Sequence, residues 1–203
     1  MTKPRSGGGL SETAKTHVKQ LVIESVYGFG RSISNKYTRK GQMMEDEAIS
    51  SVGLVTGDFL FKHEGRVEND FISGECDVLL PNSIVDTKCS WSADTFPWFK
   101  DDAVKAVKES GYDWQMRGYM WLYDRPAAEV VYVLLPTPVE LLGFGDDPYD
   151  HTTRVEGIPL ERRIQRVRVE RDADLEQQIA EKVALARDYM TELYSEHPHF
   201  FGE

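Results

Sequence analysis

The sequence predicts an α/β fold, a mixed α/β sandwich in which a central mixed β-sheet is flanked by helices. Segments with the apolar period of amphipathic helices lie at both ends and in the middle of the chain. They cover residues 13–27, about 40–53, 101–108, 112–123 and 173–195. Strand patterns lie among them, at 58–62, 66–71, 77–86, 129–135 and 163–170. Helices interleaved with strands in this way are typical of helices packed on a shared sheet.

The first half of the chain offers clear start and stop signals. Ser11 is a good N-cap for the first helix, which Gly28 ends. In the second helix, Met44, Ala48 and Val52 recur at helical spacing. The strands at 58–62 and 66–71 are joined through His63-Glu64-Gly65, and a hairpin follows at 77–86, where Pro81-Asn82 supplies the turn.

The second half has a looser middle and a regular end. Residues 129–135 form a Val-rich run typical of a strand that is buried on both faces. Residues 136–159 are polar and rich in Gly and Asp, which predicts a long loop or flap. The next strand alternates, with Val167 and Val169 on one face and arginines on the other.

Length and composition favour one large domain. The chain has 203 residues, for which we expect a flexible, basic lead-in over residues 1–10 and a single domain over residues 11–203. It contains no run long enough for a membrane span and no signal peptide, so we expect a cytoplasmic protein with no membrane partner. Its only two cysteines, Cys76 and Cys89, are too few for an iron–sulfur cluster held by four cysteines.

The charge is unevenly distributed. The net charge is -10 and the pI is about 5.0, which by themselves disfavour a nucleic-acid partner. Residues 1–44, however, carry eight Lys and Arg against two Glu. We expect the basic stretch after the first helix to contact DNA phosphates, the alternative being an ordinary solvated surface. The candidate residues are Arg31, Lys36, Arg39 and Lys40.

The hairpin carries a concentration of charge. Asp86 and Lys88 are two residues apart on a strand, so they share one face while Thr87 points away. Asp77, on the neighbouring strand, can reach the same face. Two carboxylates in a poorly solvated place repel each other unless a cation lies between them, and Mg²⁺ or Mn²⁺ suits oxygen ligands. The alternative is a surface hairpin whose polar residues face water.

Four features in order resemble the PD-(D/E)xK nuclease superfamily. They are the helix Gly41-x-x-x-Glu45, the strand residue Asp77, the triplet Asp86-Thr87-Lys88, and the helix Gln115-x-x-x-Tyr119. The likeness is strongest to the branch that contains the RecB nuclease domain, phage lambda-type exonucleases and YqaJ-type viral recombinases. It covers residues 38–123 and implies a restriction-endonuclease-like core within the domain over residues 11–203.

The resemblance also implies a role for each matched residue. Glu45, Asp77 and Asp86 would bind one or two Mg²⁺ or Mn²⁺ ions, with the Thr87 carbonyl as a further ligand. Glu47 is an alternative to Glu45 as the ligand on the helix. Lys88 would be the catalytic lysine. Gln115 and Tyr119 would brace the site or touch DNA.

We therefore expect a divalent-metal-dependent DNA nuclease. The resemblance favours an exonuclease on linear duplex DNA that acts in phage-type recombination or repair. It implies duplex ends as the substrate, and a single-strand annealing protein and a second copy of the chain as further partners. The alternatives are an endonuclease of the same fold, or a non-catalytic protein that binds DNA ends or assembles others. The complete set of Asp77, Asp86 and Lys88 counts against a non-catalytic protein, because a decayed site should lose at least one member.

Overall fold

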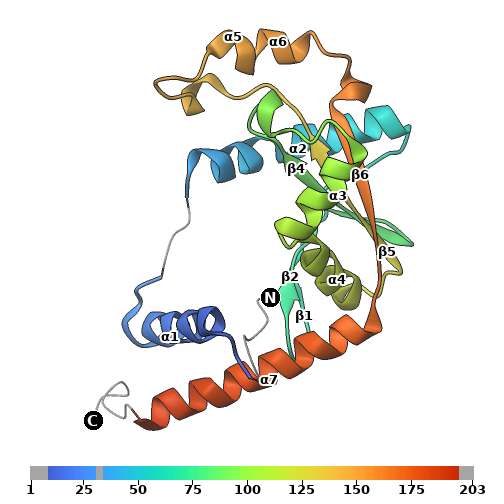
Figure 1. Ribbon diagram of the computed structural model, residues 1–203. Helices are drawn as coiled ribbons and strands as arrows, with labels where there is room; N and C mark the ends of the chain where they lie inside the picture. The colour runs from blue at the N-terminus through green and yellow to red at the C-terminus, as the bar shows by residue number, and fades with distance from the viewer. Residues whose placement is uncertain (1–8, 31–33, 197–203) are drawn as a thin grey trace. The chain divides into compact units, whose positions relative to one another are not determined.

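Figure 1 shows the computed structural model of the chain, which describes residues 9–30 and 34–196. These residues belong to two compact units. The larger unit spans residues 33–171, and the smaller one combines residues 1–32 with residues 172–203. The expectation of a single domain over residues 11–203 stays a prediction.

The larger unit is built on a four-stranded sheet with the strand order β3-β4-β5-β6. β4 and β5 run parallel to each other, whereas β3 and β6 each run antiparallel to their neighbour. The sheet is therefore mixed, as the sequence predicted. Its strands are β3 (Val78–Leu79), β4 (Ser83–Cys89), β5 (Ala127–Val133) and β6 (Ile164–Glu170).

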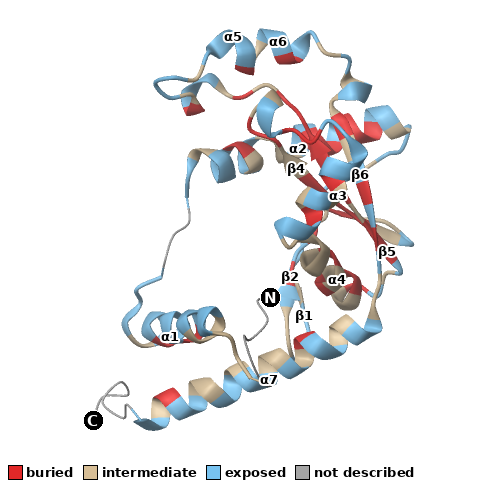
Figure 2. Ribbon diagram, in the orientation of Figure 1, coloured by how far each residue is buried: buried red, intermediate tan, exposed pale blue. Residues whose placement is uncertain are grey.

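Helices cover both faces of this sheet, and most of the buried residues in Figure 2 lie between these layers. On one face, Ile84 and Val130 pack among buried residues of α3 (Lys100–Glu109) and α4 (Tyr112–Leu122). On the other face, Val85 and Val131 pack against α2 (Lys36–Thr56). This arrangement confirms the predicted α/β sandwich.

Helix α2 begins four residues before the predicted start. The Asn35 side chain accepts hydrogen bonds from the backbone N–H groups of Tyr37 and Thr38, and the Thr38 hydroxyl accepts one from the Asn35 N–H. This capping box satisfies N–H groups that the first helical turn leaves unpaired. The helix therefore includes Lys36 and Arg39, which lie before the predicted start at about residue 40.

The segment before the hairpin differs from the prediction. Residues 58–62 form no strand, and only β1 (Val67–Glu68) lies within the strand predicted at 66–71, pairing with β2 (Ser73–Gly74). Phe59 and Phe61 alternate along this predicted first strand, but the side chains of both are exposed. Alternating residues form a strand only where one face is covered, and this face is open to solvent.

The remaining segments are short connections. The stretch after β4 contains η1 (Ala93–Thr95). The long connection between β5 and β6 is not a plain loop, because it includes several single turns of helix. These are η2 (Val139–Leu141), α5 (Pro148–His151), α6 (Thr153–Glu156) and η3 (Leu160–Arg162).

The described part of the smaller unit pairs α1 (Glu12–Tyr27) with α7 (Ala173–Glu196). Ser11 caps α1 by accepting a hydrogen bond from the Ala14 N–H, as predicted. Val18, Val22 and Leu193 form the small buried core of the pair. Residues 1–8 of the predicted lead-in lie outside the described residues. Of the helices that the structure describes, none is both long enough and apolar enough to cross a membrane.

Candidate active site

The predicted hairpin forms, and its ladder stops where the site begins. Val78 pairs with Val85 and Leu79 with Ile84, so the same register places Asp77 opposite Asp86. The ladder ends there because the Thr87 N–H donates to Asp77 Oδ2 (2.7 Å) instead of to a strand carbonyl. The Thr87 hydroxyl donates to the same oxygen (2.8 Å). Beyond this point β4 pairs with β5 alone among the described strands, so the other edge of Asp86–Lys88 has no paired strand, and we call it the open edge of β4.

Asp86 is the buried centre of the site. Its side chain lies on the same face of β4 as Ile84, the face that α3 and α4 cover, and the residue is 1% exposed. Lys88 Nζ lies 2.5 Å from Asp86 Oδ2, so this buried carboxylate and the ammonium form an ion pair. Burial raises the pKa of Asp86 to about 6; Lys88 opposes this shift, and the charges of Asp77 and Glu45 add to it.

Lys88 is held between a carboxylate and an aromatic ring. Burial by itself lowers the pKa of Lys88, but the charges of Asp86 and Asp77 outweigh it, so the pKa lies above its ordinary value. The Lys88 ammonium stands 4.7 Å from the centre of the Tyr112 ring, a cation–π contact. Two carboxylates therefore keep this lysine protonated, and one aromatic ring holds its ammonium beside the open edge of β4.

Gln115 and Tyr119 lie beside these residues, as predicted. The Gln115 amide donates to the Tyr119 hydroxyl at 2.9 Å, one helical turn away on α4. Burial raises the pKa of Tyr119, the hydrogen bond from Gln115 lowers it, and the charge of Asp86 raises it further. A Cβ atom at position 74 would stand 2.6 Å from the Tyr119 ring, so Gly74 is required for the close approach of the ring to β2.

Glu45 approaches the site from α2. It is the helix glutamate whose charge contributes to the raised pKa of Asp86, whereas Glu47 is exposed and acts on Cys89. Glu45 Oε1 lies 3.1 Å from Lys62 Nζ, and hydrogen bonding to Glu45 raises the pKa of Lys62. Of the two alternatives, Glu45 is the one whose charge acts on Asp86, and its role as the ligand on the helix stays a prediction.

The donor chemistry of the site fits a hard divalent cation. The hairpin register, extended by one residue, brings Asp77 next to Asp86, and carboxylate oxygens are the ligands that Mg²⁺ and Mn²⁺ prefer. Within residues 9–30 and 34–196, no group of three His, Cys, Asp or Glu side chains is close enough together to hold a metal ion. Each of the three predicted carboxylate ligands has a partner in this structure: Glu45 pairs with Lys62, Asp86 pairs with Lys88, and Asp77 accepts from Thr87. The Thr87 carbonyl as a ligand stays a prediction.

The four predicted phosphate contacts have different surroundings. Arg31 lies outside the described residues. Lys36 pairs with Asp146 at 2.8 Å and lies over the Trp91 ring, and Arg39 is exposed. The prediction that Lys40 contacts a phosphate is wrong, because Lys40 is completely buried and cannot reach a phosphate in this structure. Its ammonium donates to Ser90 O, Trp91 O, Leu135 O and Thr137 Oγ1 at 2.7–3.1 Å.

The sequence analysis did not identify Tyr112 or Lys62. Tyr112 lies three residues before Gln115, so the helical spacing that joined Gln115 to Tyr119 could have placed all three on one face of α4. Lys62 gave no such signal, because it lies in an irregular segment.

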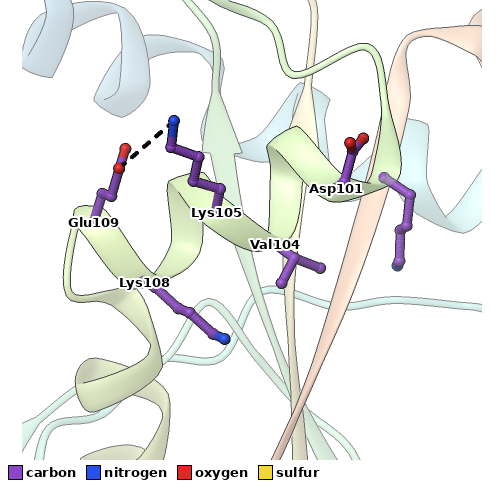
Figure 3. Close-up of a pocket in the computed structure, with 6 residues that line it drawn as sticks. Asp101, Val104, Lys105, Lys108 and Glu109 are labelled. Atoms are coloured by element: carbon purple, nitrogen blue, oxygen red, sulfur yellow. Dashed lines mark ion pairs between the residues drawn. The ribbon is translucent and has the colours of Figure 1, made fainter.

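A separate groove follows α3 (Figure 3) and contains none of the predicted site residues. Its charges are mixed, and Lys105 approaches Glu109 to 3.9 Å. We assign it no role in the site.

Comparison with known proteins gives structural matches alone. No protein-family model matches the chain, and no curated protein does. The crystal structure of a phage-related exonuclease from Haemophilus somnus 129PT matches with a TM-score of 0.91 and 40% identity, over 96% of this chain and 91% of that one. An alkaline exonuclease, LHK-Exo, from Laribacter hongkongensis matches with a TM-score of 0.63 and 18% identity, over 98% and 85%. The same enzyme in complex with dAMP matches with a TM-score of 0.63 and 19% identity, over 91% and 84%.

Proposed function

The chain belongs to the phage-related exonuclease family of the PD-(D/E)xK nucleases, and on this premise we propose that it is a divalent-metal-dependent exonuclease of linear duplex DNA. The observation that carries the proposal is the open edge of β4. There, Asp77, Asp86 and Lys88 meet beside Gln115 and Tyr119, and the buried Asp86 carboxylate pairs with Lys88.

Asp77, Asp86 and Glu45 are the residues that would hold Mg²⁺ or Mn²⁺, as one or two ions. A divalent cation supplies charge neutralisation at the phosphate and a more acidic water. Asp86 is suited to this role because its burial and its carboxylate neighbours disfavour its charge, and a cation relieves both effects. Asp77 is already oriented by the two hydrogen bonds from Thr87.

Lys88 acts on the reacting groups rather than on the cation. Its raised pKa keeps the ammonium protonated at neutral pH, so it can stabilise negative charge that develops on the phosphate. The Tyr112 ring limits where this ammonium can move. Gln115 orients the Tyr119 hydroxyl, and the pair presents polar groups to the site from α4.

The partners follow from the same proposal. A duplex end is the substrate, and Arg39 is the exposed member of the basic stretch among the described residues, whereas Lys36 is paired with Asp146. The complex of LHK-Exo with dAMP supports nucleotide binding by this fold. A homo-oligomer that encloses DNA would suit processive digestion, and a single-strand annealing protein would receive the product strand.

Incubation with end-labelled linear duplex and with covalently closed circular duplex tests the proposal. In Mg²⁺ the linear DNA should shorten progressively while the circles survive, and EDTA should stop the reaction. Rapid linearisation of closed circles would favour the endonuclease. Binding to ends without any hydrolysis in Mg²⁺ or Mn²⁺ would favour the non-catalytic protein.

A further inference from the structure

Lys62 lies on an irregular segment that is fastened to the site. The N–H of the next residue, His63, donates to the Asp77 carbonyl at 2.7 Å. The His63 ring packs edge-on against Tyr123, with 5.2 Å between the ring centres, and the Tyr123 hydroxyl donates to Gly65 O at 3.1 Å. The backbone around Lys62 is therefore anchored beside Asp77, although it belongs to no strand.

The side chain of Lys62 neutralises acidic groups of α2. Its ammonium lies 3.1 Å from Glu45 Oε1 and 3.6 Å from Asp46 Oδ1. The Lys62 side chain is 43% exposed and that of Glu45 is 28% exposed. Ion pairs in such surroundings contribute little to stability, because water and salt screen them. A divalent cation that binds the Glu45 carboxylate would therefore displace Lys62 at little cost in free energy.

We propose that Lys62 is a displaceable counter-ion of Glu45. It neutralises this carboxylate in the metal-free protein, and binding of a divalent cation releases its ammonium to contact a DNA phosphate. The inference rests on the proposed function, in which Glu45 is a metal ligand. It goes beyond that function by adding a lysine whose availability to DNA depends on the metal.

The first test measures metal affinity in the absence of DNA. Calorimetric titration with Mn²⁺ should give tighter binding to Lys62→Met than to the unchanged protein, by about two- to fivefold, the range that corresponds to losing a partly exposed ion pair. Lys105→Met is the matched control, since Lys105 is also an exposed lysine near a carboxylate (Figure 3), and it should leave the affinity unchanged. Unchanged or weaker Mn²⁺ binding by Lys62→Met overturns the proposal.

The second test measures the salt dependence of DNA binding, with a duplex whose phosphorothioate linkages resist hydrolysis. In Mg²⁺, Lys62→Met should lower the slope of log K against log salt by about one, the change expected for one lost phosphate contact. In EDTA, the slopes of the two proteins should agree, because Glu45 then holds Lys62. Equal slopes in Mg²⁺ overturn the proposal. If the unchanged protein bound no Mn²⁺ at all, the metal-dependent function itself would fail as well.

Discussion

At the scale of single residues, the site concentrates charge that the fold alone does not relieve. Asp86 is buried close to the carboxylate of Asp77, and Lys88 is its ion-pair partner. A carboxylate in such a place costs folding free energy, which a bound cation would offset. Function and stability are therefore opposed at this position.

Substitution of Asp86 tests this opposition. Its pKa is about 6 in the folded protein against 3.8 ordinarily, so the folded state binds more protons between these values. The free energy of unfolding should therefore fall as pH rises from about 4 to 6. Above pH 6 Asp86 is charged in both states, so the destabilisation should stay constant. In EDTA at pH 7.5, Asp86→Asn should be more stable than the unchanged protein by about 1–3 kcal/mol, a difference that vanishes toward pH 4. Urea unfolding at both pH values measures it.

The control is Glu47→Gln, which replaces an exposed carboxylate on α2 and should show no such pH-dependent gain. An Asp86→Asn protein less stable than the unchanged one in EDTA at pH 7.5 would mean that Lys88 already compensates the Asp86 charge.

The Tyr112 ring offers a second test at this scale. Because the Lys88 ammonium lies over the ring, Tyr112→Leu should lower kcat by about 2- to 30-fold, the range of one cation–π contact. Tyr112→Phe keeps the ring and should retain most of the activity. Rates on linear duplex, with Tm measured alongside, distinguish the two variants. Equal losses in both would assign the effect to the hydroxyl instead of the ring.

At the scale of elements, one buried lysine joins α2 to the ends of two sheet strands through hydrogen bonds. Lys40 lies in the first turns of α2 and donates to carbonyls that follow β4 and β5. Burial lowers the pKa of Lys40 to about 8, so the ammonium is still protonated at neutral pH. Glu45 lies five residues further along the same helix, so these hydrogen bonds also help to fix the position of Glu45.

Removing these hydrogen bonds should destabilise the protein. Lys40→Met leaves the Ser90 and Leu135 carbonyls without this donor, while Trp91 O keeps the hydrogen bond from the Thr137 hydroxyl, and we expect a loss of about 2–4 kcal/mol in the free energy of unfolding. Arg39→Met, one residue away and exposed, should change it by less than about 0.5 kcal/mol. Urea unfolding of both variants is the measurement. Equal stability of the two would show that the four hydrogen bonds contribute nothing.

The sequence predicted the helices and the hairpin better than it predicted which of their side chains are buried. The hairpin followed from its turn and its apolar pattern, and the α4 pair followed from helical spacing, because both signals are local. The strand at 58–62 was wrong, since alternation at Phe59 and Phe61 does not reveal whether a face is covered. Lys40 was misplaced for a related reason. Its four acceptors come from segments 50 to 97 residues away in the chain, and nothing near it in sequence marks them.

At the scale of the whole molecule, an acidic protein has to bind a polyanion. The net charge of -10 disfavours DNA at long range, so binding must depend on local positive groups and on cations. Fewer residues of the basic stretch are accessible to DNA than the sequence suggested, because Lys40 is buried and Lys36 is paired with Asp146. Arg39 is the exposed member.

Arg39 should therefore account for a measurable part of the salt dependence. Arg39→Ala should weaken duplex binding and lower the slope of log K against log salt by about one. Fluorescence anisotropy over a range of salt concentrations measures this slope, with Lys105→Ala as an exposed control. An unchanged slope would return Arg39 to the ordinary solvated surface.

The most direct measurement pairs Mn²⁺ titration calorimetry with cleavage rates on end-labelled linear duplex, for Asp86→Asn and Lys88→Ala. Asp86→Asn removes a buried carboxylate, so metal affinity and cleavage should fall together. Lys88→Ala removes a positive charge, so metal affinity should hold or rise slightly while cleavage falls by about a hundred- to ten-thousandfold. If Lys88→Ala lost the metal, and Asp86→Asn kept both the metal and the activity, the active site would not lie at this edge of β4.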